Sequence, residues 1–80
     1  MSYHTRDIEK GIIGEFSKIK EEFEEAEDAF KQNDSILTIC ELSDMVGAIE
    51  EYIKRWNLDL ISLKQFSDKT KSAFREGKRK

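Results

Sequence analysis

The first third of the chain repeats apolar residues at the spacing of one helix face. Between residues 8 and 30 they follow one another three or four positions apart, as Ile8, Ile12, Phe16, Ile19, Phe23, Ala26 and Phe30. An α-helix returns to the same face at this interval, so the pattern predicts an amphipathic helix of roughly two dozen residues. Thr5 is placed to cap its start. Gly11 and Gly14 lie inside the pattern, where we expect a close helix contact or a loosened first turn.

A second helix is expected from about Ser35 to Trp56, because the polar run 33–35 ends the first helix and offers caps to the next. Its main apolar stripe consists of Leu42, Met45, Val46, Ile49, Ile53 and Trp56. Further apolar residues lie on its other faces: Ile36, Leu37, Cys40 and Ala48. Such a helix offers more apolar surface than two neighbouring helices can cover. The sequence therefore predicts a homo-oligomer, either a dimer or a tetramer.

A shorter third helix is expected after a connector at residues 57–61. Ser62 and Gln65 stand at the spacing of a capping box, and Gly77 is a natural helix terminator. Residues 76–80 form a basic tail that is expected to fray. The 80 residues contain no proline and no internal repeat, so they indicate one all-α domain over residues 1–80. We expect two long antiparallel helices and a shorter C-terminal helix, assembled into a bundle by oligomerisation.

Two pairs of acidic residues stand on the two predicted long helices. Glu22 and Glu25 are three positions apart on the first helix, and Glu41 and Asp44 are three apart on the second. Residues at this spacing are neighbours on a helix surface, so an antiparallel hairpin can turn all four carboxylates towards one another. Two like charges ~4 Å apart cost about 4 kcal/mol at an effective dielectric constant of about 20. A cation is therefore expected between them, and hard oxygen ligands suit Mg²⁺ or Mn²⁺.

Charge and cysteine content indicate in which compartment the protein functions and which kinds of partner it binds. The net charge is −3, and basic residues gather towards the C-terminus, where Asp68 and Glu76 interrupt them. This interrupted pattern argues against a nucleic-acid partner. The single cysteine, Cys40, excludes an internal disulfide, and no stretch resembles a signal peptide or a membrane span. We therefore expect a cytoplasmic protein without a membrane partner, in which His4, close to the terminus, is inert.

Two segments of the hairpin resemble a known family. The segment KIKEEFEEAEDAF followed by ELSDMVGAIEEYI is similar to the MazG-like all-α nucleotide pyrophosphohydrolases, which share an EExxE segment, a spacer and an ELxD segment. The chain resembles in particular the short single-domain phage-type members, whose last third is similar to KTKSAFREGKR here. The resemblance covers residues 11–79.

The resemblance implies a Mg²⁺-dependent hydrolase that splits a nucleoside triphosphate between its α and β phosphates, giving a monophosphate and pyrophosphate. It also implies that four acids hold the metal, one of them orienting or deprotonating the attacking water: Glu22, Glu25, Glu41 and Asp44. Metal ions suit this chemistry because they polarise phosphoryl oxygens and lower the pKa of bound water.

Basic residues of the third helix are candidates to bind the substrate's phosphates: Lys69, Lys71 and Arg75. The alternative is that they only complement the negative C-terminal end of that helix. Glu-rich runs are also common on solvated helix faces. The second hypothesis for the whole chain is therefore a catalytically inactive helical bundle that binds another protein through its apolar surplus.

Overall fold

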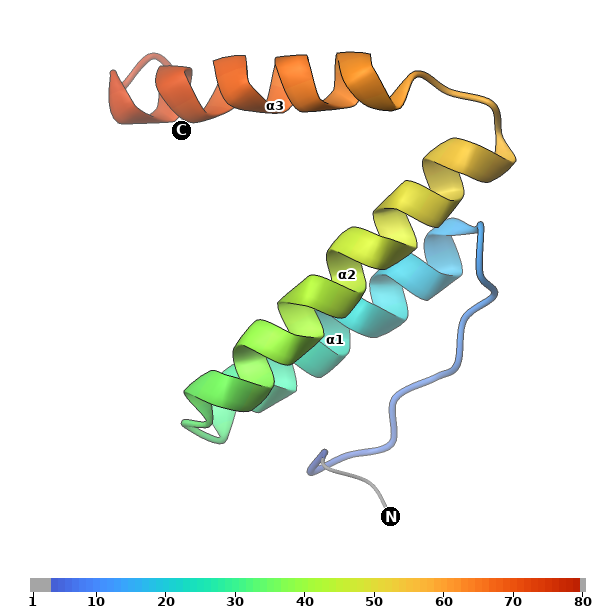
Figure 1. The fold of residues 1–80 in the computed structure, drawn as a ribbon. Coiled ribbons are helices and arrows are strands. Elements are labelled where there is room, and N and C mark those ends of the chain that lie inside the picture. The colour runs from blue at the N-terminus through green and yellow to red at the C-terminus, as the bar shows by residue number, and fades with distance from the viewer. Residues whose placement is uncertain (1–3, 80) are drawn as a thin grey trace.

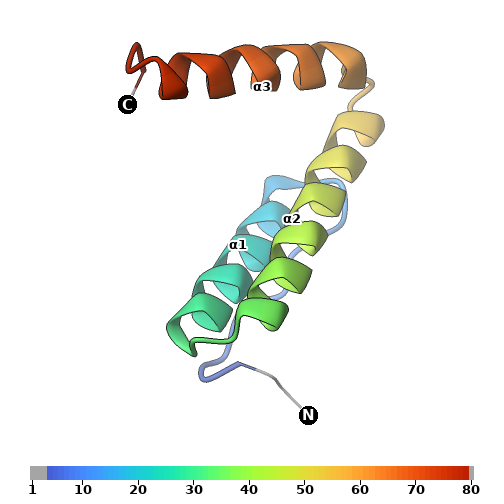
Figure 2. The ribbon, with the colours of Figure 1, turned by 60° about the vertical axis from the view of Figure 1, so that its left-hand side comes forward.

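A computed structural model describes residues 4–79 of the chain, and this part contains helices and no strand. Helices α1 (Phe16–Lys31) and α2 (Ser35–Arg55) form an antiparallel hairpin, and α3 (Leu60–Arg75) turns away from the end of α2 (Figures 1 and 2). The predicted all-α fold is thus confirmed for the described residues. Residues 1–3 of the lead-in and residue 80 of the predicted tail lie outside them.

The boundary between α1 and α2 agrees with the sequence prediction. Asn33 adopts a left-handed conformation with φ of 60°, which ends α1. The Asp34 side chain then caps α2 by accepting a hydrogen bond from the Leu37 N–H at 2.9 Å. Polar residues with short side chains therefore fix this turn.

The start of α3 differs from the prediction. Asp59 is its cap, because its carboxylate accepts hydrogen bonds from the backbone N–H groups of Ile61 and Ser62 at 2.9 and 3.3 Å. The capping box predicted at Ser62 is therefore wrong, and the helix begins at Leu60. Its end is as predicted, since Gly77 follows in the left-handed region with φ of 74°.

The largest difference concerns residues 4–15. The helix predicted from Thr5 begins only at Phe16, and residues 4–15 instead run beside α1 as an extended segment, here called the N-terminal arm (Figure 1). Gly14 has φ of 89°, a conformation that suits glycine and interrupts a helix. Gly11 lies so close to the start of α1 that a Cβ atom there would stand 2.2 Å from the Ser17 carbonyl oxygen. Both glycines therefore allow the arm to follow its path beside α1, and neither belongs to a helix.

Gly11 and Gly47 offer a matched test of the arm. We expect Gly11→Ala to lower the free energy of unfolding by about 1–3 kcal/mol, because the added methyl group must displace backbone. Gly47→Ala should raise it by about 0.5–1 kcal/mol, because Gly47 is inside α2 and open space surrounds its Cα. Urea denaturation of the metal-free proteins measures both changes. Equal stabilisation by both substitutions would contradict the described path of the arm.

Among residues 4–79, the buried side chains between α1 and α2 are small or acidic, while Phe16 of α1 stacks on Tyr52 of α2 at the edge of the contact. The buried apolar residues are all alanines: Ala26 and Ala29 on α1 and Ala48 on α2. Four buried acidic residues accompany them: Glu21, Glu22, Asp28 and Glu41. Alanine allows two helices to approach closely, which brings acids from both helices into one region.

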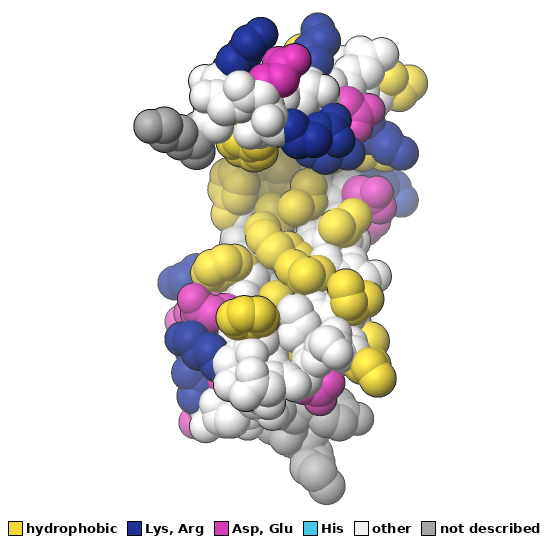
Figure 3. All heavy atoms as spheres, turned by 90° about the vertical axis from the view of Figure 1, so that its left-hand side faces the viewer, with side chains coloured by type: hydrophobic (Ala, Val, Ile, Leu, Met, Phe, Trp, Pro, Cys, Tyr) yellow, Lys and Arg dark blue, Asp and Glu magenta, His cyan; other side chains and the backbone are white. Residues whose placement is uncertain are grey.

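Large apolar side chains remain exposed on the single chain. Phe16 and Phe30, from the stripe predicted to face a core, are 67% and 72% exposed. No described residue of α3 is buried, and that helix contacts α2 only near the connector. Figure 3 shows apolar side chains gathered along the hairpin and beneath α3. Among residues 4–79, no helix combines the length and apolar character needed to cross a membrane.

Candidate metal centre

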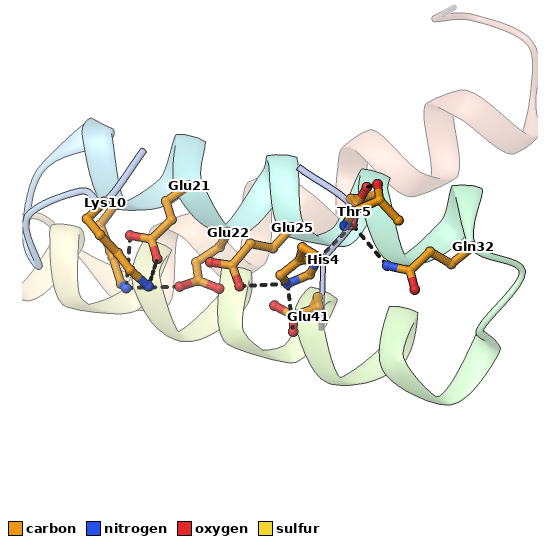
Figure 4. A network of polar contacts seen from close by, with 10 residues as sticks. His4, Thr5, Lys10, Glu21, Glu22, Glu25, Gln32 and Glu41 are labelled. Atoms are coloured by element: carbon orange, nitrogen blue, oxygen red, sulfur yellow. Dashed lines mark hydrogen bonds and ion pairs between the residues drawn. The ribbon is translucent and has the colours of Figure 1, made fainter. Parts of the chain in front are cut away.

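Three of the four predicted acids meet inside the hairpin. Glu22 and Glu25 come from α1 and Glu41 from α2 (Figure 4). The side chains of Glu22 and Glu41 are 8% and 9% exposed. Asp44 is exposed, but a carboxylate oxygen of Asp44 still lies within 4.8 Å of oxygens from Glu22 and Glu41. The spacing argument thus places these side chains correctly on facing helices.

Two of these carboxylates each have an oxygen without a hydrogen-bond partner. Among the described residues, no donor reaches the buried Oε2 atoms of Glu22 and Glu41. The other oxygen of Glu22 is 3.0 Å from the Nζ atom of Lys18. A buried polar atom left without a partner costs about 1–3 kcal/mol, and more when it is charged. These two oxygens are therefore suited to a bound cation.

His4 is the residue that the sequence analysis misjudged. It was expected to be inert, but its Nδ1 atom lies 3.0 Å from Asp28 Oδ2 and its Nε2 atom 3.1 Å from Glu25 Oε2. The same Nε2 atom is 3.7 Å from Glu41 Oε1. His4, Glu25 and Glu41 form a second group whose ligand atoms lie within 4.8 Å of one another. Two of the groups therefore share Glu41, and a third group, made of Glu21, Glu22 and Glu25, joins the two predicted acids of α1.

The arm is fastened to α1 by carboxylates that the prediction did not include. Asp28 accepts hydrogen bonds from the Thr5 hydroxyl and, at 3.0 Å, from the Thr5 N–H. Gln32 donates a third at 2.9 Å. The hydrogen bonds from Thr5 are the main reason why the pKa of Asp28 lies well below its usual range. Further along the arm, the Gly11 N–H donates to Glu21 Oε1 at 2.8 Å.

A signal for the arm was present in the sequence. Two glycines three positions apart weaken a helix, so the chain before them was free to fold back. Nothing in residue spacing identified which acids would receive it.

Burial, hydrogen bonds and neighbouring charges together shift the pKa values of Glu21 and Glu25 in opposite directions. Burial, followed by the proximity of Glu21, Glu22 and Glu41, raises the pKa of Glu25 to about 7. Burial opposes ionisation of Glu21 too, but the Gly11 N–H, Glu25 and Lys18 together lower its pKa to about 2. The centre therefore contains one carboxyl group that exchanges its proton near neutral pH.

This shift predicts how stability depends on pH without metal. Between about pH 4.5 and 7 the folded protein keeps a proton on Glu25 that the unfolded chain has lost, so stability falls as pH rises. Glu25→Gln cannot ionise. Relative to wild type it should be equally stable at pH 4 and more stable by as much as about 3 kcal/mol at pH 8. Urea denaturation in a chelating buffer measures this, and a variant less stable than wild type at pH 8 would contradict it.

Two of the three acids in the Glu22, Glu41 and Asp44 group, Glu22 and Asp44, line a surface groove of about 410 Å³. Its lining includes Lys18, Glu22 and Asp44, together with Ile13, Ser43, Gly47, Ala48, Glu50 and Glu51. Small-molecule sites have volumes of about 300–1,000 Å³. A ligand can therefore reach the carboxylates from this side.

The three basic residues predicted to bind phosphate lie on α3 and do not reach the acidic cluster of the hairpin within their own chain. Lys71 pairs with Asp68 at 2.9 Å, and Arg75 lies 3.4 Å from the Ser72 hydroxyl, both within α3. Lys69 is exposed on the same helix. The cation that borders the acids is Lys18, whose own pKa Glu22 raises. Sequence analysis did not select Lys18.

Comparison with known proteins leaves the family open. No protein-family model, curated protein or solved structure matches the chain.

Proposed function

We propose that the chain is a divalent-cation-dependent hydrolase of nucleoside triphosphates, releasing a monophosphate and pyrophosphate. The observation that carries the proposal is the pair of buried, unpartnered oxygens on Glu22 and Glu41, with Asp44 beside them at the groove. Oxygen ligands alone suit Mg²⁺, and Mn²⁺ is also compatible. The resemblance of both acidic segments to MazG-like pyrophosphohydrolases supports the same reaction.

The residues of the centre have distinct roles in this proposal. Glu22, Glu41 and Asp44 hold a Mg²⁺ ion, which when bound polarises phosphoryl oxygens. Lys18, at the edge of the groove, attracts the phosphate chain. A water oxygen bonds to phosphorus as the bridging P–O bond between the α and β phosphates breaks. Glu25, whose carboxylate lies beside those of Glu22 and Glu41, accepts the proton of that water as general base.

The proposal includes assembly of identical chains. Exposed apolar residues on α1, α2 and α3 would be covered in a homo-oligomer, and a basic α3 from a second copy would complement the acidic centre. Lys69, Lys71 and Arg75 would then approach the substrate's phosphates from the partner chain. We place the assembly in the cytoplasm, where the free thiol of Cys40 stays reduced.

Pyrophosphate release tests the proposed reaction. The metal-free protein is incubated with a panel of ribonucleoside and deoxyribonucleoside triphosphates, with and without Mg²⁺. We expect Mg²⁺-dependent pyrophosphate release from at least one of them. Release of orthophosphate alone would contradict cleavage between the α and β phosphates.

The exposed apolar surface supports a second candidate, an inactive bundle that binds a protein partner. Thermal unfolding separates the two. A cation at about 100 times its dissociation constant stabilises the hydrolase by about 2.7 kcal/mol. Mg²⁺ should not change the melting temperature of an inactive bundle, and such a bundle would hydrolyse no triphosphate.

A further inference from the structure

We infer that His4 gives the centre a second cation position, formed with Glu25 and Glu41, that binds Zn²⁺ or Co²⁺ in preference to Mg²⁺. The position goes beyond the proposed function, because the ion can bind there whether or not the chain hydrolyses triphosphates. It is distinct from the Glu22, Glu41 and Asp44 group, with which it shares only Glu41.

The imidazole ring is oriented as a metal ligand. Its Nδ1 atom lies 3.0 Å from Asp28 Oδ2, while Nε2 points between Glu25 and Glu41 (Figure 4). Histidines that bind metals characteristically donate their other ring N–H to a carboxylate, which fixes the tautomer and the ring. Asp28 is positioned as this acceptor, because the Thr5 hydroxyl and N–H both donate hydrogen bonds to its carboxylate and hold it in place.

The spacing of the donor atoms suits a small ion. Two ligands on a tetrahedral Zn²⁺, each ~2.0–2.1 Å from the metal, stand about 3.3 Å apart. In the protein Nε2 is 3.1 Å from Glu25 Oε2 and 3.7 Å from Glu41 Oε1. The two distances from Nε2 are therefore within a few tenths of an ångström of the separation expected between ligands of one small ion.

The burial of Glu41 also favours a bound cation. Its Oε1 atom is the one 3.7 Å from His4 Nε2, and its Oε2 atom is buried with no hydrogen-bond donor among residues 4–79. The Glu41 side chain is 9% exposed, so water satisfies it poorly. A cation that His4 and Glu25 hold would neutralise this carboxylate.

The donor set predicts the choice of ion. Imidazole suits zinc, copper, iron and nickel, whereas purely oxygen ligands suit magnesium, calcium and manganese. The two groups that share Glu41 should therefore bind different metal ions. The one with His4 should select a transition metal, and the one with Asp44 should accept Mg²⁺.

Because the sequence contains one histidine, NMR can observe the ligand directly. Protein without an affinity tag, labelled with ¹⁵N-histidine and carrying Cys40→Ser to exclude thiolate binding, is titrated with Zn²⁺ and then with Mg²⁺. We expect Zn²⁺ to shift the Nε2 resonance by metal coordination and to leave Nδ1 protonated. Mg²⁺ should leave the Nε2 resonance in place. An Nε2 resonance that Zn²⁺ does not shift would overturn the inference.

Calorimetry of variants tests the same position independently. His4→Gln and Glu25→Gln should each weaken Zn²⁺ binding at least about tenfold and Mg²⁺ binding by less. Asp44→Asn should weaken Mg²⁺ binding more than Zn²⁺ binding. Glu27→Gln, which changes an exposed carboxylate of α1, is the control and should change neither affinity. Unchanged Zn²⁺ affinity in His4→Gln would overturn the inference.

Pyrophosphate release by the same proteins keeps this failure separate from failure of the proposed function. If only the inference fails, His4→Gln binds Zn²⁺ as wild type does while wild type still hydrolyses triphosphates with Mg²⁺. If only the proposed function fails, no triphosphate is cleaved, yet Zn²⁺ still shifts the Nε2 resonance.

Discussion

Replacing Glu41 with glutamine is expected to lower the rate of triphosphate hydrolysis by about 100-fold or more. Glu41 is the one carboxylate that belongs to both candidate cation positions. The substitution preserves the size of the side chain but removes its charge and a strong oxygen ligand. Steady-state measurement of pyrophosphate release with Mg²⁺ gives the rate.

The same substitution should not destabilise the metal-free protein. The Oε2 atom of Glu41 is buried without a donor, and other carboxylates surround it. An amide carries no charge and can donate a hydrogen bond to one of them, so the melting temperature should stay equal or rise. The shift that Mg²⁺ produces in wild type should largely disappear.

Glu27→Gln is the matched control, because that carboxylate is exposed and outside both groups. It should keep wild-type turnover and the full Mg²⁺ shift. Suppose instead that Glu41→Gln lowered the metal-free melting temperature and kept its response to Mg²⁺. The acids would then be a structural network, and the proposed hydrolase would have no metal centre here.

The second large effect is expected at the apolar face of α2. The Leu42→Glu, Val46→Glu double variant should dissociate to a 9.4 kDa monomer at concentrations where wild type is oligomeric. Leu42 and Val46 are 45% and 55% exposed in the single chain, and on α2 they lie opposite Glu41 and Ala48, which face α1. Burying each side chain contributes about 1.5–3 kcal/mol, and an isologous interface contains each one twice. The double substitution should therefore weaken association by roughly 10⁴-fold or more.

Light scattering and analytical ultracentrifugation at micromolar concentration measure this change. Lys54→Glu, which introduces the same negative charge at an exposed polar position of α2, should leave the assembly intact. A wild-type protein that is itself a compact monomer would contradict self-association. In that case the metal centre would have to function with the residues of a single chain.

Local sequence determined that the chain forms three helices and where some of them end, but not where α1 and α3 begin. The period of apolar residues specified α2 and α3, and Asp34 and Gly77 marked two of the boundaries, because capping depends on residues only a few positions apart. Spacing also placed Glu22 and Glu25 on one helix and Glu41 and Asp44 on the other. A hairpin of antiparallel helices then brings these acids together with no further information.

Tertiary structure decided the direction of each helix face and the path of the arm. Periodicity placed Phe16, Ala26 and Phe30 on one stripe of α1. Ala26 is buried as that stripe predicts, but periodicity did not show that Phe16 and Phe30 would stay largely exposed or that Ala29, outside the stripe, would be buried. It extended the first helix through Gly11 and Gly14, whose backbone conformations and close contacts arise only once the arm has folded back.

His4 illustrates the same limit in the candidate site. It is separated from Glu25 and Asp28 by 21 and 24 positions, and no periodicity relates residues on an irregular segment to residues on a helix. Its place follows from hydrogen bonds such as those from Thr5 to Asp28 and from Gly11 to Glu21. Sequence patterns record which residues neighbour one another along a regular helix. The contacts that fold an irregular segment onto that helix depend on distances that only the tertiary structure fixes.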